Sequence, residues 1–85
     1  MRLDQWLWAV RLFKSRALAA EAIRQGYVRL EGRSPKPSAE VRPGQSLEVC
    51  AGNNPSRLCS LKVLALPDRR ISAKTVPEFL ERTHP

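Results

Sequence analysis

The sequence predicts an α+β protein, in which two short N-terminal helices precede a small set of strands. Apolar residues recur at helical spacing as far as residue 25, whereas later segments alternate apolar and polar residues. Turn signals that contain glycine and proline separate these later segments. The chain has 85 residues, which is the length of one domain with a small core. We therefore expect a single domain over residues 1–85.

The first helix is expected to begin at Asp4, a suitable N-cap residue, with Arg2 in the lead-in. The apolar positions share one helical face: Leu3, Trp6, Leu7 and Val10. Trp8 falls beside this stripe. We expect Trp8 to be a partly buried structural ring, and stacking on a nucleic-acid base is the alternative.

The second helix follows a short break at Phe13 and Lys14. Ser15 is its expected N-cap, the helix runs to Gln25, and Gly26 takes the left-handed position beyond its end. The expected apolar face consists of Leu18, Ala19, Ala22 and Ile23. A separate stripe places two arginines around a small residue: Arg16, Ala20 and Arg24. That stripe would admit a bulky nucleic-acid backbone, or it is an ordinary solvated helix face.

Three later segments alternate and are predicted strands: residues 27–30, 46–50 and 58–66. Turns are expected at Glu31–Gly32 and Pro43–Gly44, and a loop over residues 51–56. A short helix is expected over residues 77–82. The sequence thus divides into an N-terminal part, 1–50, and a strand and tail extension, 51–85.

Positive charge is concentrated in the N-terminal half. The whole chain carries a net charge of +7 and has a pI of about 10.5. Residues 1–42 hold nine basic and four acidic side chains, for a net charge of +5, and the remainder contributes +2. Such an excess implies an anionic partner, such as nucleic acid or acidic lipid, although charge that serves only solubility is the alternative.

Basic residues gather where the second helix begins. Lys14, Ser15 and Arg16 lie at a helix N-terminus, where free backbone N–H groups and partial positive charge favour phosphate. Arg2 and Arg11 would flank this position from the first helix. Arginine forks match phosphate oxygens in bidentate geometry. Two basic residues of the loop after the first strand would close the other side: Arg33 and Lys36.

The composition excludes several classes of protein. No stretch of about 20 apolar residues is present to span a membrane, and Asp4 and Arg11 interrupt the N-terminal apolar run, so no signal peptide is expected. We expect a cytoplasmic protein in which Cys50 and Cys59 are free thiols, brought near each other across the loop of a hairpin. Two cysteines and one distant His84 do not make a zinc site, and no metal or cofactor is expected.

No catalytic constellation is present in the sequence. Ser15 has no histidine near it, the carboxylates are single residues beside arginines, and no glycine-rich phosphate loop occurs. We therefore expect a binding protein and not an enzyme.

The order of these residues resembles the RNA-binding domain named after small-subunit ribosomal protein S-four. The resembling segments are Arg2-Leu3-Asp4, Arg11, Lys14-Ser15-Arg16, the alanine-rich helix to Ile23, Gly26-Tyr27-Val28, Gly32 and Lys36-Pro37-Ser38. Further segments resemble the family of the bacterial fifteen-kilodalton heat-shock protein: Trp6-Leu7-Trp8, Arg33-Ser34, Gly52-Asn53 and Arg69-Arg70. Glu31 and Gln45 depart from the pattern, where asparagine and aspartate are usual. Heat-shock proteins of this family also continue beyond the position of Pro85 into a long basic segment.

The resemblance implies two helices packed on a small, mostly antiparallel sheet, with residues 1–50 as the RNA-binding core. It also implies binding to structured ribosomal RNA, association with the large ribosomal subunit and a role in heat stress. The expected RNA-binding residues, from charge and resemblance together, are Arg2, Arg11, Lys14, Ser15, Arg16, Arg24, Arg33, Lys36 and Ser38. We expect a monomer that has no membrane partner.

Two other functions stay open at this point. Two helices joined by a short basic turn also fit a DNA-binding helix-turn-helix protein, although the second helix offers no well-placed asparagine or glutamine to contact bases. The basic face would equally suit docking on an acidic protein.

Overall fold

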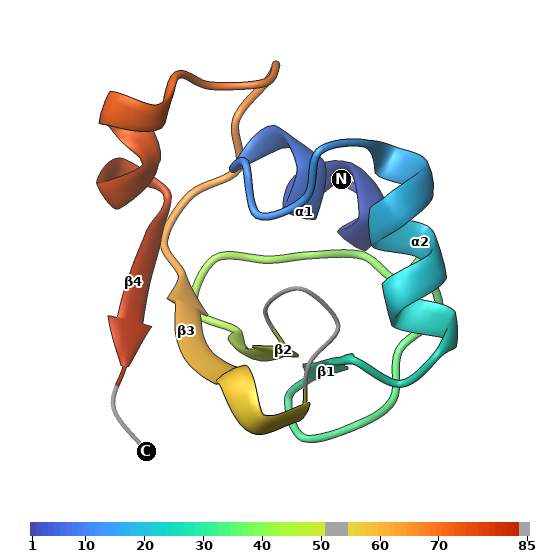
Figure 1. Ribbon diagram of the computed structural model, residues 1–85. Coiled ribbons are helices and arrows are strands. Elements are labelled where there is room, and N and C mark those ends of the chain that lie inside the picture. The colour runs from blue at the N-terminus through green and yellow to red at the C-terminus, as the bar shows by residue number, and fades with distance from the viewer. Residues whose placement is uncertain (51–54, 84–85) are drawn as a thin grey trace.

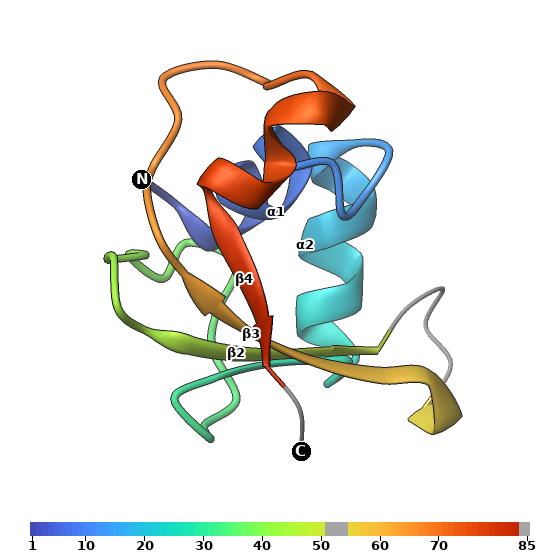
Figure 2. The same cartoon turned by 90° about the vertical axis from the view of Figure 1, so that its left-hand side faces the viewer.

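A computed structural model describes residues 1–50 and 55–83 of the chain. Two helices, α1 (Leu3–Ala9) and α2 (Arg16–Arg24), lie over one face of a sheet (Figures 1 and 2). The sheet has four strands in the order β1-β2-β3-β4, and every neighbouring pair is antiparallel. The strands are β1 (Val28–Leu30), β2 (Ser46–Cys50), β3 (Leu58–Val63) and β4 (Leu80–Thr83). This arrangement confirms the predicted α+β class and the packing of two helices on an antiparallel sheet.

Helix α1 begins two residues earlier than a cap at Asp4 predicts. Arg2 occupies the N-cap position without a side-chain cap, and Asp4 lies inside the first turn, so the predicted Asp4 cap is wrong. The reason is tertiary. The N–H groups of Leu3 and Asp4 donate to the carbonyls of Ala39 and Pro37, at 2.8 and 3.1 Å. A loop distant in sequence therefore satisfies the helix end.

In helix α2, the predicted N-cap at Ser15 and the predicted left-handed residue after its C-terminal end, Gly26, are both confirmed. The Ser15 Oγ accepts a hydrogen bond from the Leu18 N–H at 3.1 Å. At the other end, Gly26 has φ +85°, and the N–H groups of Gly26 and Tyr27 donate to Ile23 and Ala22. This pattern is a Schellman motif, which requires the left-handed conformation that glycine adopts without strain.

The predicted faces of α2 are partly wrong. Leu18, expected in the core, is 53% exposed, whereas Ala20, expected between the exposed arginines, is only 7% exposed. The buried face is instead made of Ala19, Ala20, Ala22 and Ile23. Three alanines let α2 pack closely on its neighbours, and this turns Leu18 outward. Ala20 therefore offers no approach to a nucleic-acid backbone.

Both predicted turns are present. Glu31 and Gly32 have φ of +53° and +75°, and Leu30 and Arg33 exchange two backbone hydrogen bonds across them. These values define a type I′ turn, which glutamate adopts less readily than asparagine. The turn is supported by Glu31 itself, whose Oε1 accepts the Ser46 N–H at 2.6 Å. At Pro43–Gly44, the Gln45 N–H donates to the Arg42 carbonyl at 3.3 Å.

The tail differs from the prediction. Strand β3 ends at Val63 and not at residue 66, because the N–H groups of Leu64 and Ala65 turn to the Phe79 carbonyl. The expected helix over residues 77–82 is wrong. A 3₁₀ helix, η3 (Ala73–Glu78), comes first, and residues 80–83 form the edge strand β4. The open edge of β3 gives this segment hydrogen-bond partners, which local sequence cannot reveal. Of the loop expected over 51–56, residues 51–54 lie outside the described part, and η2 (Pro55–Arg57) follows them.

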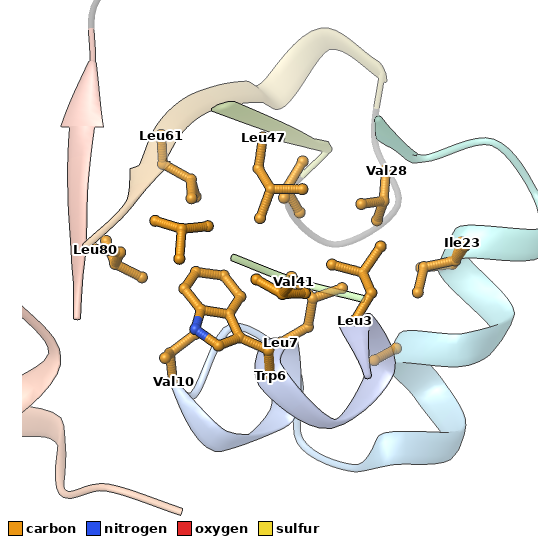
Figure 3. Packing of buried hydrophobic residues seen from close by; sticks show 14 residues of the cluster. Leu3, Trp6, Leu7, Val10, Ile23, Val28, Val41, Leu47, Leu61 and Leu80 are labelled. Atoms are coloured by element: carbon orange, nitrogen blue, oxygen red, sulfur yellow. The ribbon is translucent and has the colours of Figure 1, made fainter. Parts of the chain in front are cut away.

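The core lies between the helices and the sheet (Figure 3). Trp6 is fully buried at its centre, and its indole N–H donates to the Ala65 carbonyl at 3.1 Å. Leu3, Leu7 and Val10 join it from α1 and the residue after it, as the helical spacing predicts. The sheet contributes Val28, Leu47, Val49, Leu61, Val63 and Leu80.

The cysteines are free, as predicted. Cys59 pairs with Val49 in the β2–β3 register, and Cys50 pairs with Leu58. Paired residues share a face and successive residues alternate, so Cys50 and Cys59 project from opposite faces of the sheet. Their nearness along the hairpin therefore does not favour a disulfide.

We predict that Leu61→Ala lowers the free energy of unfolding by about 2–5 kcal/mol, because it removes a fully buried side chain and leaves a cavity. Leu58→Ala, in the same strand but at a position 51% exposed, should cost about 1 kcal/mol or less. Urea titration followed by tryptophan fluorescence measures both. Equal losses for the two variants would contradict the described burial.

Candidate nucleic-acid interface

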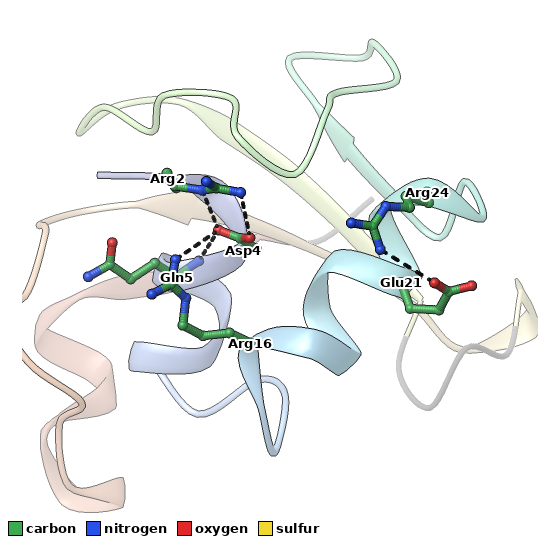
Figure 4. A network of polar contacts seen from close by, with 6 residues as sticks. All are labelled: Arg2, Asp4, Gln5, Arg16, Glu21 and Arg24. Carbon is green, nitrogen blue, oxygen red and sulfur yellow. Dashed lines mark hydrogen bonds and ion pairs between the residues drawn. The ribbon is translucent and has the colours of Figure 1, made fainter.

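The Asp4 carboxylate joins arginines from both helices (Figure 4). Arg2 donates to it twice, through Nε at 3.2 Å and Nη2 at 3.1 Å. Arg16, at the start of α2, places its Nη2 3.7 Å from Asp4 Oδ1. The Gln5 N–H completes the set at 2.7 Å. The Asp4 side chain is only 8% exposed, so its charge is compensated by these partners.

The two arginines remain available to an external anion. Their side chains are 50% and 47% exposed, and they share one carboxylate between them. The group of Arg2, Asp4 and Arg16 therefore carries a net charge of +1, with its single negative charge buried underneath. Because a guanidinium has five N–H donors, each arginine keeps donors that Asp4 does not use. The buried Asp4 carboxylate thus holds the guanidinium groups of Arg2 and Arg16 in place while both remain partly exposed to solvent.

The start of α2 adds a second source of positive potential beside Arg16. The Ser15 Oγ accepts from Leu18, and this leaves the hydroxyl hydrogen free to be donated outward. Lys14 precedes it and is exposed. The first-turn N–H groups of a helix carry partial positive charge. The first turn of α1 is covered by the loop at residues 37–39, whose carbonyls accept its N–H groups. In the described part of the chain, no such carbonyl accepts from the N–H groups of Arg16 or Ala17 in the first turn of α2.

The loop after β1 brings Lys36 and Ser38 to the same region. The Pro37 carbonyl between them accepts the Asp4 N–H, and Arg2 forms an antiparallel bridge with Glu40. Lys36 and Ser38 are both exposed. The structure thus gathers six of the predicted residues around the start of the two helices: Arg2, Lys14, Ser15, Arg16, Lys36 and Ser38.

Three predicted residues lie elsewhere. Arg24 is at the opposite end of α2, paired with Glu21 at 3.5 Å, and Figure 4 shows this pair as a separate group. Arg33 is in the hairpin turn after β1. The Arg11 guanidinium donates to the Ile71 carbonyl at 3.3 Å. The predicted stripe of Arg16, Ala20 and Arg24 is therefore not one continuous cationic surface.

Sequence reasoning assigned no role to Arg42, which is an exposed member of the same loop. The loop lies along the N-terminus, because the Val41 N–H donates to the Met1 carbonyl. At this edge, the Met1 ammonium contacts Glu40 at 2.9 Å and holds the pKa of that carboxyl below its usual value. The pairing of this loop with residues 1–4 brings Arg42 close to the N-terminus, and this pairing is visible only in three dimensions.

Two other kinds of site, a metal centre and a membrane-spanning helix, are not evident in the part of the chain that the structure describes. Among residues 1–50 and 55–83, no group of three or more histidine, cysteine or acidic side chains is placed to hold a metal ion. No helix within these ranges has the length and apolar character needed to cross a membrane.

The chain belongs to the S4 domain family, whose model matches residues 1–47. That range contains all nine predicted RNA-binding residues.

Relatives are found among two groups of proteins. Heat shock protein 15 of Escherichia coli K12 is 37% identical over 98% of this chain and 60% of its own length. The RQC P-site tRNA stabilizing factor of Bacillus subtilis is 40% identical over 80% of this chain and 76% of its own. The trimeric structure of heat shock protein 15 from Vibrio cholerae has a TM-score of 0.89 at 30% identity, covering 98% of this chain and 81% of that one. The chain spans about 60% of the length of the E. coli relative.

We predict that Asp4→Asn lowers the free energy of unfolding by about 1–3 kcal/mol, because Arg2 and Arg16 then face each other without the buried anion. Urea denaturation measures the change. Asp68→Asn is the matched control, since Asp68 is 91% exposed and should leave stability unchanged. If Asp4→Asn unfolds at the same urea concentration as the wild-type protein, the carboxylate does not organise the helix pair.

Proposed function

We propose that the protein binds structured RNA through the surface formed by Arg2, Lys14, Ser15, Arg16, Lys36 and Ser38. The observation that carries this proposal is the Asp4 junction, which holds Arg2 and Arg16 in fixed positions beside the capped start of α2. Fixed arginine forks suit the regularly spaced phosphates of a folded RNA. We further propose that it acts as a binding protein and not as an enzyme, with residues 1–50 as the core and 51–85 as an extension.

The relatives support a more specific partner. Proteins named heat shock protein 15 and RQC P-site tRNA stabilizing factor match most of this chain. We propose large-subunit ribosomal RNA as the target, ribosome association during heat stress as the setting, and the cytoplasm as the location.

DNA binding by a helix-turn-helix is less well supported. The exposed face of α2, which would enter the major groove, carries Glu21 at its middle. Arg24 pairs with Glu21, and the Gln25 amide donates to it at 2.8 Å, so the side chains suited to base contacts are engaged within the helix.

A competition assay tests the proposal. The protein should bind a fluorescein-labelled RNA hairpin. Unlabelled A-form RNA should displace this hairpin from the protein better than B-form DNA of matched sequence does. If about four to six phosphates are neutralised, log affinity should fall against log salt with a slope of about −3 to −5. A slope near zero would favour docking on a protein instead, and preferential displacement by DNA would favour the helix-turn-helix function.

We predict that Arg16→Ala weakens binding to the RNA hairpin by about 1–3 kcal/mol, the range for a charge-assisted contact. Unfolding free energy should fall by less than about 1 kcal/mol, because Arg2 still pairs with Asp4. Arg69→Ala removes the same charge from a side chain that is 83% exposed and remote in sequence, and it should change affinity much less. Equal affinities for the two variants would remove Arg16 from the interface.

A further inference from the structure

The connector between α1 and α2, residues 10–15, depends on contacts from outside its own neighbourhood. It carries Lys14 and Ser15, and it includes Arg11 at φ +67°, a backbone conformation that arginine rarely adopts. Within the connector, the N–H groups of Arg11 and Leu12 donate back to the last turn of α1. These bonds fix its start. Leu12 and Phe13 pack against the core, but no backbone hydrogen bond described within the connector holds the stretch next to Lys14.

Arg70, in the segment after β3, contacts both the last turn of α1 and Phe13 of the connector. Its Nε donates to the Trp8 carbonyl at 3.2 Å, and its Nη2 donates to the Phe13 carbonyl at 3.4 Å. The guanidinium carbon also lies over the Trp8 ring, 5.5 Å from the ring centroid. One planar group thus ties the end of α1 to the residue directly before Lys14. Figure 1 shows the segment after β3 passing close to the start of the connector.

Ile71, the residue after Arg70, adds two hydrogen bonds to the same region, one as a donor and one as an acceptor. The Ile71 N–H donates to the Ala9 carbonyl at 3.0 Å, and the Ile71 carbonyl accepts from the Arg11 guanidinium at 3.3 Å. Residues 70–71 therefore donate hydrogen bonds to α1 and the connector, and the connector donates one back through Arg11. This explains why Arg11, predicted to contact RNA, is directed to the tail.

We propose that Arg70 is a positioning residue for the RNA interface: it holds the connector in the conformation that presents Lys14 and Ser15 beside Arg16. This inference rests on the proposed RNA-binding function. Arg70 lies beyond residues 1–47, the part matched by the S4 domain model. The extension thus completes the binding core by fixing its connector, without itself contacting RNA.

The variant Arg70→Lys separates geometry from charge. Lysine keeps the positive charge but offers a point donor in place of a planar fork, so it cannot bond both carbonyls and stack on Trp8 in the same way. Arg69→Lys is the matched control, because Arg69 contacts Asp68 at 3.8 Å and is largely exposed. Thermal unfolding of both variants verifies that they fold.

Two measurements test the proposal on the full chain, with the fluorescein-labelled RNA hairpin as the probe. Arg70→Lys should accelerate amide hydrogen exchange at Arg11, Leu12 and Ile71, whose N–H groups donate to Trp8, Leu7 and Ala9. It should also weaken binding by about three- to tenfold, the size expected when the binding-competent conformation loses one ordinary net hydrogen bond. Arg69→Lys should change neither. If Arg70→Lys matches Arg69→Lys in exchange and in affinity, the proposal is overturned.

A double variant distinguishes positioning from direct contact. If Arg70 acts through Lys14, adding Arg70→Lys to Lys14→Ala should change affinity by less than about twofold. A full, multiplicative loss would mean that Arg70 contacts RNA itself, and it would overturn the positioning role. If the wild-type protein fails to bind the hairpin, the proposed function fails, whereas hydrogen exchange in Arg70→Lys still decides whether Arg70 fixes the connector.

Discussion

Burial of the Asp4 carboxylate constrains how the N-terminal half of this protein is assembled. A charge removed from water must be paired and hydrogen-bonded, and Asp4 obtains its partners from its own helix, from Arg2 and from Arg16 of the next helix. Its backbone N–H in turn holds the loop at Pro37. A single residue thus joins α1, α2 and the loop after β1, and these are the segments that carry the candidate interface.

The same junction resolves an apparent conflict between an acidic residue and an anionic partner. An exposed carboxylate among basic side chains would repel phosphate, but Asp4 lies beneath the two arginines and is almost inaccessible. Its effect on RNA is therefore indirect. It reduces the number of conformations that two long side chains sample, so less conformational entropy would be lost in the phosphate binding that we propose.

The tail has a structural role that the N-terminal half cannot fill alone. Ala65 accepts the Trp6 indole N–H, β4 covers the edge of β3, and Arg70 and Ile71 bond the connector. A chain of this size has a small core, so contacts between its two parts contribute a large share of its stability. The tail accordingly supports the core and, as we propose, the geometry of the candidate interface.

The sequence by itself determined the features that depend on local rules. Ser15 and Gly26 mark the two ends of α2, and the turns at Glu31 and Pro43 are present. The helical spacing of Leu3, Trp6 and Leu7 marks a buried face. Periodicity and turn chemistry act over a few residues, so they are visible without a structure. The concentration of basic residues in the range 1–42 also led to the interface that we propose.

Only the tertiary structure decided which of those residues act together. Asp4 was expected to cap α1, but a loop more than thirty residues away caps it, and Asp4 joins the helices instead. Ala20 is buried and Leu18 exposed because the packing partner, and not the helical wheel alone, selects the buried face. Residues 80–83 became a strand because β3 offered an open edge. Arg69-Arg70 is visible as a segment of family resemblance, but no local pattern reveals the contacts of Arg70, since its partners lie about sixty residues earlier. Long-range hydrogen bonds and shared burial depend on which segments meet in space, and a pattern within one segment cannot specify its distant partner.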